Sequence, residues 1–438
     1  MSDRSERSGD WGPDTALTTG IIADDLTGGV LVAASLIDQG IPCPVVTEPA
    51  GVDDHCNAAA CVVAGQFRLK PAQEAVRWFD EAQKALSEKG AKHIIYKYCA
   101  TFDSTDNGNI GPCADALMRH TAADRLGFCP AFPPRGVTIY QGHIFLGSEL
   151  LCNSSKRFDP ITPMPDPDLV AVLQRQTEQK VALVSHHILT QGVEKTRCFI
   201  DQAHRQGATC FFFDAIDEND VATCADVTRG WPAMTGGDTL LATLPALQTG
   251  ERRAVADLPS LPPGNTAIIA GSCAGATLRQ LERFEERHPV MRLKLNDAAD
   301  DFSAVLESAV TWAREELSQG PIAVSIADQP ESVERIQSRF GVDNARMLGE
   351  RLCSELAAQL LKLDVNRFIV AGGETSGAVA KTLGLLAMSV YPHPDVPGGL
   401  CVSEPDQRLC CYFKAGKMGD ETIFHDLVRM FRRTSDDS

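Results

Sequence analysis

The sequence lacks any apolar run of ~18 residues, so it predicts no membrane-spanning helix. Its polar N-terminus also lacks the apolar core of a signal peptide. Positive charge is scarce, because 41 Lys and Arg face 58 Asp and Glu, for a formal net charge of −17 at pH 7. Nucleic acids and anionic membranes bind basic surfaces, so we expect neither as a partner. An anionic small molecule stays compatible, since a few local cations override the net charge.

Metal and dinucleotide motifs are missing too. The 15 cysteines include neither a CxxC pair nor a Cys/His cluster, so no structural zinc site is expected. An odd number of scattered cysteines in a long chain is typical of free thiols in a reducing cytoplasm. Neither a Walker A pattern nor GxGxxG is present. A Rossmann-type oxidoreductase is therefore a weak alternative.

What is present is a large α/β chain. Its 438 residues, 44% of them apolar, are enough for two or three domains with sizeable cores. Residues 246–265 mix charge, Pro and Gly with little periodicity, which is typical of a linker. We predict two Rossmann-like domains with mainly parallel sheets flanked by helices. The predicted parts are a disordered tail 1–16, a domain 17–246, a linker 247–265, a domain 266–432 and a tail 433–438.

The stretch Phe368–Val379 reads as a strand, a glycine turn and a helix. Gly372 and Gly373 let backbone amides approach a ligand closely. Thr375 or Ser376 is placed to cap the helix or to bind a phosphate. Since a helix N-terminus favours anions, the segment predicts a phosphate cradle. An ordinary strand-to-helix turn is the alternative.

Two more small-residue turns follow predicted strands in the second half. Gly271–Thr277 follows the strand 266–270 and opens a helix. The strand Leu409–Lys414 leads into a Gly/Lys turn, where Lys414 or Lys417 is placed to meet a phosphate. Three such turns in one domain strengthen the prediction of a phosphate site.

In the first half, Asp24 and Asp25 end the predicted strand Gly20–Ala23, before a helix predicted from Val30 to Gln39. Ligands of open α/β sheets bind at the carboxyl ends of strands. The two carboxylates therefore suit substrate hydroxyls, Mg²⁺ or a general base. The alternative is that they only complement a helix dipole.

A dense polar cluster, Phe102–Pro112, follows the predicted strand that ends at Lys97. Its hydroxyl, carboxylate and amide groups suit a polyol or sugar acid, although an Asn/Asp/Gly turn is the alternative. His143 follows another predicted strand, 137–140. It suits substrate contact or proton transfer, or a purely structural role.

Six ordered motifs resemble those of the four-carbon acid sugar kinases, over residues 18–430. The segments YKYCATFDST and IYQGHIFLG look most like the 3-oxo-tetronate kinase branch. The motifs are ADDLTG at Ala23–Gly28, DST followed by GNIG at Asp103–Gly111, GH at Gly142–His143, GSC at Gly271–Cys273, AGGETSGAV at Ala371–Val379, and KAGKMG at Lys414–Gly419.

The resemblance implies ATP-dependent phosphorylation of the terminal hydroxyl of a 3-oxo-tetronate, in a cleft between an acid-sugar domain and an ATP domain. It implies Mg²⁺ on the phosphates, Asp25 or Asp103 as proton acceptor, and Lys97 with Arg157 on the substrate carboxylate. A homodimer is compatible with the sequence, which does not determine the oligomeric state. The other implied substrate residues are Asp24, Ser104, Asn109 and His143. The implied ATP residues are Ser272, Gly372, Gly373, Glu374, Thr375, Ser376, Lys414 and Gly416.

Several positions depart from the family pattern. Leu31 stands where the family has Asp, and Ala415 and Lys417 replace Ser and Asn. Asn107 stands where a basic residue is common, and TGGDTLL at Thr235–Leu241 replaces TGGSGLA. These changes support a second hypothesis, a catalytically impaired relative that binds nucleotide or sugar acid as a regulator. Nucleotide binding without turnover would distinguish it from an active kinase.

Overall fold

A computed structural model describes residues 16–159, 161–249, 254–261, 263–326, 330–394 and 396–436. The predicted tail up to residue 15 lies outside the described residues, as do residues 437 and 438. Contacts divide the chain into two units, one ending at Arg253 and one beginning at Ala254, and this division lies within the predicted linker. No helix among the described residues is long and apolar enough to cross a membrane.

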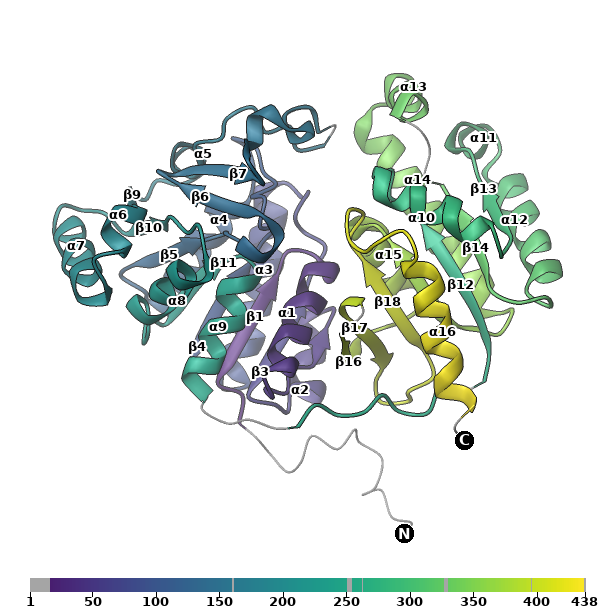
Figure 1. Ribbon diagram of the computed structural model, residues 1–438, viewed down its shortest axis with the longest axis horizontal. Coiled ribbons are helices and arrows are strands. Elements are labelled where there is room, and N and C mark those ends of the chain that lie inside the picture. Colours follow the sequence, from purple (N-terminus) through teal and green to yellow (C-terminus); the bar gives the residue numbers. More distant parts are fainter. Residues whose placement is uncertain are drawn as a thin grey trace, which may run out of the picture. The chain divides into compact units, whose positions relative to one another are not determined.

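The N-terminal unit contains a parallel sheet in the order β2-β3-β1-β4-β11-β5-β10-β9 (Figure 1). Its strands are β1 Thr19–Ala23, β2 Val45–Val46, β3 Ala60–Ala64, β4 His93–Lys97, β5 Leu126–Cys129, β9 Val181–Val184, β10 Cys210–Phe213 and β11 Ala233–Gly236. Its α-helices are α1 Leu26–Asp38, α2 Val52–His55, α3 Ala72–Glu88, α4 Ile110–Thr121, α5 Leu169–Gln176, α6 His186–Leu189, α7 Val193–Arg205, α8 Glu218–Val227 and α9 Asp238–Thr249.

The centre of this sheet is apolar on both faces. Every residue of β1 and β3 is buried, as expected for parallel strands covered by helices on both sides. Tyr96 in β4 packs edge-on against Phe79, with ring centroids 5.0 Å apart, and against Tyr98 at 5.3 Å. Side chains alternate along a strand, so this aromatic packing fixes the orientation of Lys97, which lies between the two tyrosines.

A small antiparallel sheet, β6-β7-β8, interrupts the parallel pattern. Its strands are β6 Val137–Tyr140, β7 His143–Leu146 and β8 Glu149–Leu150. The predicted strand 137–140 therefore exists but lies outside the parallel sheet. Short 3₁₀ helices of this unit are η1 Pro49–Gly51, η2 Pro133–Arg135, η3 Leu151–Asn153 and η4 Ser155–Phe158.

The C-terminal unit contains strands in the order β13-β14-β12-β15-β18-β17-β16. The pairs of β17 with β16 and with β18 are antiparallel, and the pairs from β13 to β18 are parallel. The strands are β12 Asn265–Ala270, β13 Val290–Arg292, β14 Ile322–Ser325, β15 Val365–Ala371, β16 Ala387–His393, β17 Val396–Ser403 and β18 Cys410–Lys414. The helices are α10 Gly275–Glu285, α11 Leu295–Asp300, α12 Phe302–Glu316, α13 Pro330–Phe340, α14 Val342–Leu361, α15 Gly373–Thr382 and α16 Ile423–Asp436. The predicted class, α/β with two mainly parallel domains, is confirmed.

Three sequence expectations about element ends were wrong. Helix α1 begins at Leu26 and not at Val30, because the Asp25 side chain caps it. The sequence Met234–Asp238 predicts a glycine turn that opens a helix, but strand β11 extends to Gly236. Helix α16 continues to Asp436, so the predicted tail from residue 433 is partly helical.

The cysteine prediction was partly wrong. Cys56 and Cys61 form a disulfide, whereas the other cysteines are free thiols. The neighbours Cys410 and Cys411 are both buried in β18. Within the described residues, no group of three or more His, Cys, Asp or Glu side chains is placed to hold a metal ion.

Candidate active site

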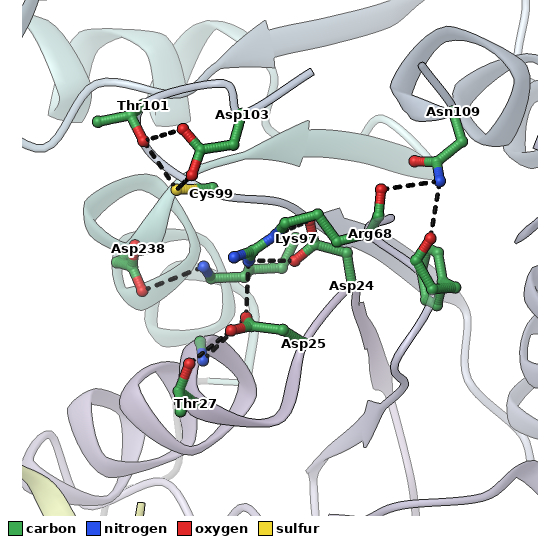
Figure 2. Close-up of polar contacts among 12 residues, drawn as sticks. Asp24, Asp25, Thr27, Arg68, Lys97, Cys99, Thr101, Asp103, Asn109 and Asp238 are labelled. Atoms are coloured by element: carbon green, nitrogen blue, oxygen red, sulfur yellow. Dashed lines mark hydrogen bonds and ion pairs between the residues drawn. The ribbon is translucent and has the colours of Figure 1, made fainter. Parts of the chain in front are cut away.

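Three neighbouring strands of the N-terminal unit end side by side. The register pairs Ala23 of β1 with Lys97 of β4, and Lys97 with Gly236 of β11. The residues that follow β1 and β11 therefore flank the Lys97 side chain. They are Asp24 and Asp25 on one side and Asp238 on the other (Figure 2). This is the carboxyl edge where parallel α/β sheets bind ligands.

Arg68 joins the two aspartates after β1. Its Nη2 lies 2.8 Å from Asp24 Oδ1 and 2.8 Å from Asp25 Oδ1, and its Nε donates to Asp24 Oδ2 at 2.8 Å (Figure 2). Backbone N–H groups of Phe67 and Arg68 also donate to the Asp24 carbonyl oxygen. Sequence analysis missed Arg68, although a basic residue just after a predicted strand was the available signal.

Burial raises the pKa values of Asp24 and Asp25, whereas the neighbouring positive charges lower them. Burial raises the pKa of Asp24, and the Arg68 charge only partly offsets it. For Asp25, burial also favours the protonated form, but Arg68, Lys97 and the bonds from Thr27 and Gly28 lower its pKa overall. Asp25 is also the α1 N-cap, accepting from the Gly28 N–H at 3.0 Å. Both carboxylate oxygens of Asp25, one of the two predicted proton acceptors, therefore already accept hydrogen bonds within the protein.

Lys97 is 2% exposed and forms an ion pair with Asp238, with Nζ and Oδ1 3.5 Å apart (Figure 2). Burial alone would lower the pKa of Lys97, but Asp238, Asp25 and Asp24 raise it overall. A Cβ on Gly28 would lie 2.5 Å from the Lys97 ammonium nitrogen and 2.6 Å from Asp25 Oδ1, so a side chain there would force these groups to move. Packing against Lys97 and Asp25 therefore explains the glycine at position 28 of the ADDLTG motif.

Asp103 lies in a second charged group. Its Oδ1 accepts from Thr101 Oγ1 at 2.7 Å and lies 2.8 Å from Lys156 Nζ. Lys156 also contacts Asp159 at 3.0 Å. Burial opposes ionisation, but the charges of Lys156 and Arg68 lower the pKa of Asp103 to about 2. The charge of Arg68 thus acts on Asp103, and Lys156 forms a direct ion pair with it. Sequence analysis missed Lys156 as a site residue.

Arg157 is not part of this group in the described contacts. Its side chain is exposed, and its guanidinium lies over the ring of Phe158, 5.6 Å from the centroid. Lys156 and Arg157 both lie in the 3₁₀ helix η4, in which Lys156 is buried and Arg157 is exposed. A carboxylate-binding role for Arg157 stays a prediction.

The polar cluster after β4 is partly structural. Asn109 Nδ2 donates to the carbonyl oxygen of Arg68 at 3.1 Å (Figure 2). It also donates to those of Phe67 and Lys70 at 2.7 and 3.0 Å. Asn109 therefore braces the loop that carries Arg68. Ser104 Oγ accepts from Gln176 Nε2 at 2.9 Å. A cavity of about 340 Å³ lies beside this cluster, and its lining includes Ser104, Thr105, Asp106, Asn107 and Arg175.

His143 lies apart from these charged groups by its described contacts. It begins β7 of the small sheet, and its Nδ1 is 2.8 Å from the Gln141 carbonyl oxygen. Among the described residues, no hydrogen bond or ion pair joins His143 to Asp24, Asp25 or Asp103. Its substrate role stays a prediction.

The C-terminal unit forms its candidate site from backbone. Strands β12, β15 and β18 are neighbours, and their ends are tied together. The N–H groups of Gly271 and Ser272 donate to the Ala371 carbonyl oxygen at 3.0 and 3.1 Å, and Gly372 donates to Lys414 at 2.8 Å. This arrangement brings the three predicted glycine turns to one edge.

The glycines at this edge let neighbouring hydroxyl side chains pack close to the backbone. A Cβ on Gly271 would lie 2.1 Å from Thr375 Oγ1, and one on Gly416 would lie 2.1 Å from Ser272 Oγ. Gly372 has a φ of 127°, which disfavours other residues. Exposed backbone at a helix start suits phosphate oxygens. We call Gly271, Ser272, Gly372, Thr375 and Gly416 the glycine cradle.

Helix α15 begins at Gly373 with Gly372 as its N-cap and without a side-chain cap bond. The prediction that Thr375 or Ser376 caps this helix was wrong, because both lie inside its first turn. Thr375 instead faces Gly271. The Ser376 hydroxyl is buried and has no hydrogen-bond partner among the described residues. Glu374 is half-buried.

Lys414 stabilises the loop of the third turn. Its Nζ lies 3.2 Å from Thr277 Oγ1 and 3.0, 3.1 and 3.1 Å from the carbonyl oxygens of Ala415, Gly416 and Met418. Burial lowers the pKa of Lys414 to about 8. Lys414 therefore holds its own loop, and Lys417 is the exposed cation there.

Two family models match the chain. One, described as a sugar-binding N-terminal domain, matches residues 19–244. The other, described as a nucleotide-binding C-terminal domain, matches residues 267–424. The first contains the Arg68 and Asp103 groups, and the second contains the glycine cradle.

Relatives match over nearly the whole chain. The 3-oxo-tetronate kinase of Burkholderia multivorans is 36% identical, over 94% of this chain and 96% of its own length. That of Pseudomonas fluorescens is 37% identical, over 92% and 95%. Among solved structures, a Salmonella typhimurium LT2 protein described as a tRNA synthase has a TM-score of 0.78 at 30% identity, covering 96% of this chain and 99% of its own. A Haemophilus influenzae protein has a TM-score of 0.72 at 30% identity, covering 94% and 100%.

Proposed function

Because the chain belongs to the four-carbon acid sugar kinase family and most resembles its 3-oxo-tetronate kinase branch, we propose that it phosphorylates the terminal 4-hydroxyl of a 3-oxo-tetronate with ATP. The observation that carries the proposal is the 36% identity to a 3-oxo-tetronate kinase over 94% of the chain. The two matched domains supply the two kinds of site that such a reaction needs.

The charged residues after β1 and β4 are proposed to bind the sugar acid. Carboxylates and cations at one strand edge suit a small molecule that carries several hydroxyls and one carboxylate. Of the two proposed proton acceptors, Asp103 has a pKa of about 2 and that of Asp25 is lowered. Phosphoryl transfer has a loose transition state, so a weakly basic carboxylate suffices to orient the hydroxyl and take its proton late.

The glycine cradle is proposed to hold the ATP phosphates. Gly271 and Gly416 let the hydroxyls of Thr375 and Ser272 pack against this backbone beside the N-terminus of α15, where a phosphate is favoured. Mg²⁺ is proposed to bind mainly to the phosphates and water, because the described residues include no group of three or more metal-binding side chains. Bound there, it would neutralise charge on the phosphates. Lys414 is proposed to position the loop that carries Gly416.

The test is an ADP-release assay with Mg-ATP and a panel of four-carbon acids that includes both 3-oxo-tetronates. We expect turnover with one of them and a loss of 10²-fold or more in kcat for Asp103→Asn. The matched control Asp226→Asn changes an exposed carboxylate of α8 and should leave kcat unchanged. No turnover across the panel, with ATP still bound in calorimetry, would contradict the proposal.

A second candidate function is a regulatory relative that binds ligands without turnover. The observation that favours it is Leu31 in helix α1, where the resemblance implies an aspartate. Leucine neither binds a hydroxyl nor a cation. Restoring Leu31→Asp should raise kcat if the loss of this carboxylate weakens catalysis, and should leave kcat unchanged if the chain uses other groups. The homodimer, the cytoplasmic location and a site between the two domains stay predictions.

A further inference from the structure

Asp238 presents a buried oxygen that lacks a hydrogen bond. The residue is 5% exposed, and its Oδ1 has no hydrogen-bond partner among the described residues. That oxygen faces the Lys97 ammonium at 3.5 Å (Figure 2). A buried acceptor without a donor costs free energy, so it marks a place where a ligand donor would be favoured.

Lys97 is the complementary half of this feature. The Lys97 ammonium carries three N–H donors, and the residue as a whole is 2% exposed. In the part of the chain that the structure describes, the ammonium forms an ion pair with Asp238, and no other side chain is described as its hydrogen-bond or ion-pair partner. An ammonium with more N–H donors than its described partners use, and a buried acceptor oxygen without a hydrogen bond, thus lie side by side at the carboxyl ends of β4 and β11.

We propose that Asp238 is a specificity-determining residue, which with Lys97 binds a hydroxyl group of the substrate and keeps the substrate carboxylate away from Lys97. A hydroxyl oxygen accepts from the ammonium while its O–H donates to Asp238 Oδ1, so it satisfies both groups. A carboxylate only accepts. It would leave Asp238 Oδ1 unsatisfied and place a second negative charge beside it.

The surrounding charges support this assignment. Arg68 is engaged by Asp24 and Asp25, and Lys156 by Asp103 and Asp159. Arg68 and Lys156 are therefore each paired with carboxylates, and Lys97 is paired in the same way with Asp238. A protein that used Lys97 as its carboxylate clamp would gain from a neutral residue at position 238.

The inference rests on the proposed function and predicts how that site ranks its substrates. The test compares kcat/KM for the active 3-oxo-tetronate with that for the ketotetrose in which CH₂OH replaces the carboxylate. In Asp238→Ser, the preference for the acid over the neutral ketotetrose should increase about tenfold relative to the unmodified chain. Asp238→Asn keeps an acceptor oxygen but removes the charge, so it should give a smaller increase.

The control Asp226→Asn removes an exposed carboxylate from the same unit and should leave the preference unchanged. If Asp238 serves only to neutralise Lys97, the variants will melt at a lower temperature while the preference between the two substrates stays constant, and the inference is overturned. If Asp238→Ser does not fold, Asp238→Asn carries the same comparison.

A binding measurement separates this inference from the kinase proposal. Calorimetry on the full chain without ATP compares a four-carbon aldonic acid with the matching sugar alcohol. A stronger preference for the acid in Asp238→Ser supports the specificity role even if no tetronate is phosphorylated. An unchanged preference, or no binding of either ligand by any variant, overturns it whether or not the chain turns over ATP.

Discussion

The two candidate sites of this kinase are formed in opposite ways. At the ends of β1, β4 and β11, buried side chains of both charges face one another, as Arg68 does with Asp24 and Asp25. At the ends of β12, β15 and β18, the site is shaped by the absence of side chains at Gly271, Gly372 and Gly416.

This difference follows from the ligands proposed for each site. A sugar acid presents several hydroxyls, which need donors and acceptors in fixed positions. A phosphate chain is recognised by backbone N–H groups, for which bulk is the main obstacle. We therefore expect that removing a charge will impair the first site, which is proposed to bind the sugar acid. Adding a methyl group should impair the second site, which is proposed to bind ATP.

Removing Arg68 should give the largest effect. Arg68→Met leaves the Asp24 carboxylate buried without its partner, which should cost about 3–5 kcal/mol of the unfolding free energy of this unit. Hydrogen exchange of peptides from β1 and β3 would measure the loss. The control Arg229→Met breaks an exposed ion pair with Asp226 and should cost under ~1 kcal/mol. Equal losses would show that the Arg68 group is not a buried network.

Adding one methyl group to the cradle should act on nucleotide binding. Gly271→Ala forces the Thr375 side chain to move, because the new Cβ would lie 2.1 Å from its hydroxyl. An overpacking cost of about 1–3 kcal/mol corresponds to a rise in the KM for ATP of about 5- to 150-fold. Gly349→Ala in α14 is the control, since its Cβ would lie 3.0 Å from the flexible end of Ile326 and in ordinary contact with Leu295. A normal KM for Gly271→Ala would contradict the cradle.

The Asp103 group predicts a pH dependence of stability. Its pKa is held at about 2, against 3.8 ordinarily, so ionisation stabilises the folded state above pH ~4. This contribution, about 2 kcal/mol, should disappear as the pH falls from ~4 to ~2. Chemical unfolding of the unmodified chain and of Asp103→Asn between pH 5 and pH 2 would test it. The difference between the two should shrink with acid, and a constant difference would exclude the assigned pairing.

The smallest effect should come from Lys414. Lys414→Met leaves the carbonyl oxygens of Ala415, Gly416 and Met418 without their donor, so the cradle loop should loosen and the KM for ATP should rise about tenfold. Lys417→Met is the comparison, since Lys417 is exposed. A larger effect at Lys417 would mean that Lys417 contacts phosphate and that Lys414 is less important.

The strongest sequence predictions concerned local patterns. Strand, glycine turn and helix at Phe368–Val379 became β15, Gly372 and α15, because apolar β-branched runs and paired glycines constrain the backbone locally. The same holds for Asp24 and Asp25 after β1. Asp238 also stood out as a departure in a glycine-rich segment. Its partner was not evident, because β4 and β11 are far apart in the chain.

Arg68 shows the limit of such reasoning. It follows β3, and its partners follow β1, so their contact depends on β3 and β1 being neighbours in the sheet. Parallel strands need crossovers, and their order in the sheet is a property of long-range packing. Lys156 and Arg157 show the same limit at short range. Both are basic, and only the turn of η4 decides which of them reaches Asp103.

The sequence by itself determined the α/β class, the two-domain organisation, the family and the segments that end at the two sites, since these follow from local periodicity and ordered motifs. Only the tertiary structure decided which charges meet, because register across neighbouring strands places Lys97 between Asp25 and Asp238. It also showed that Asn109 and Lys414 hydrogen-bond within their own loops, while their contacts to ligands stay predictions. The physical reason is that hydrogen bonds and ion pairs depend on ångström-scale positions, which distant segments set only when they pack together.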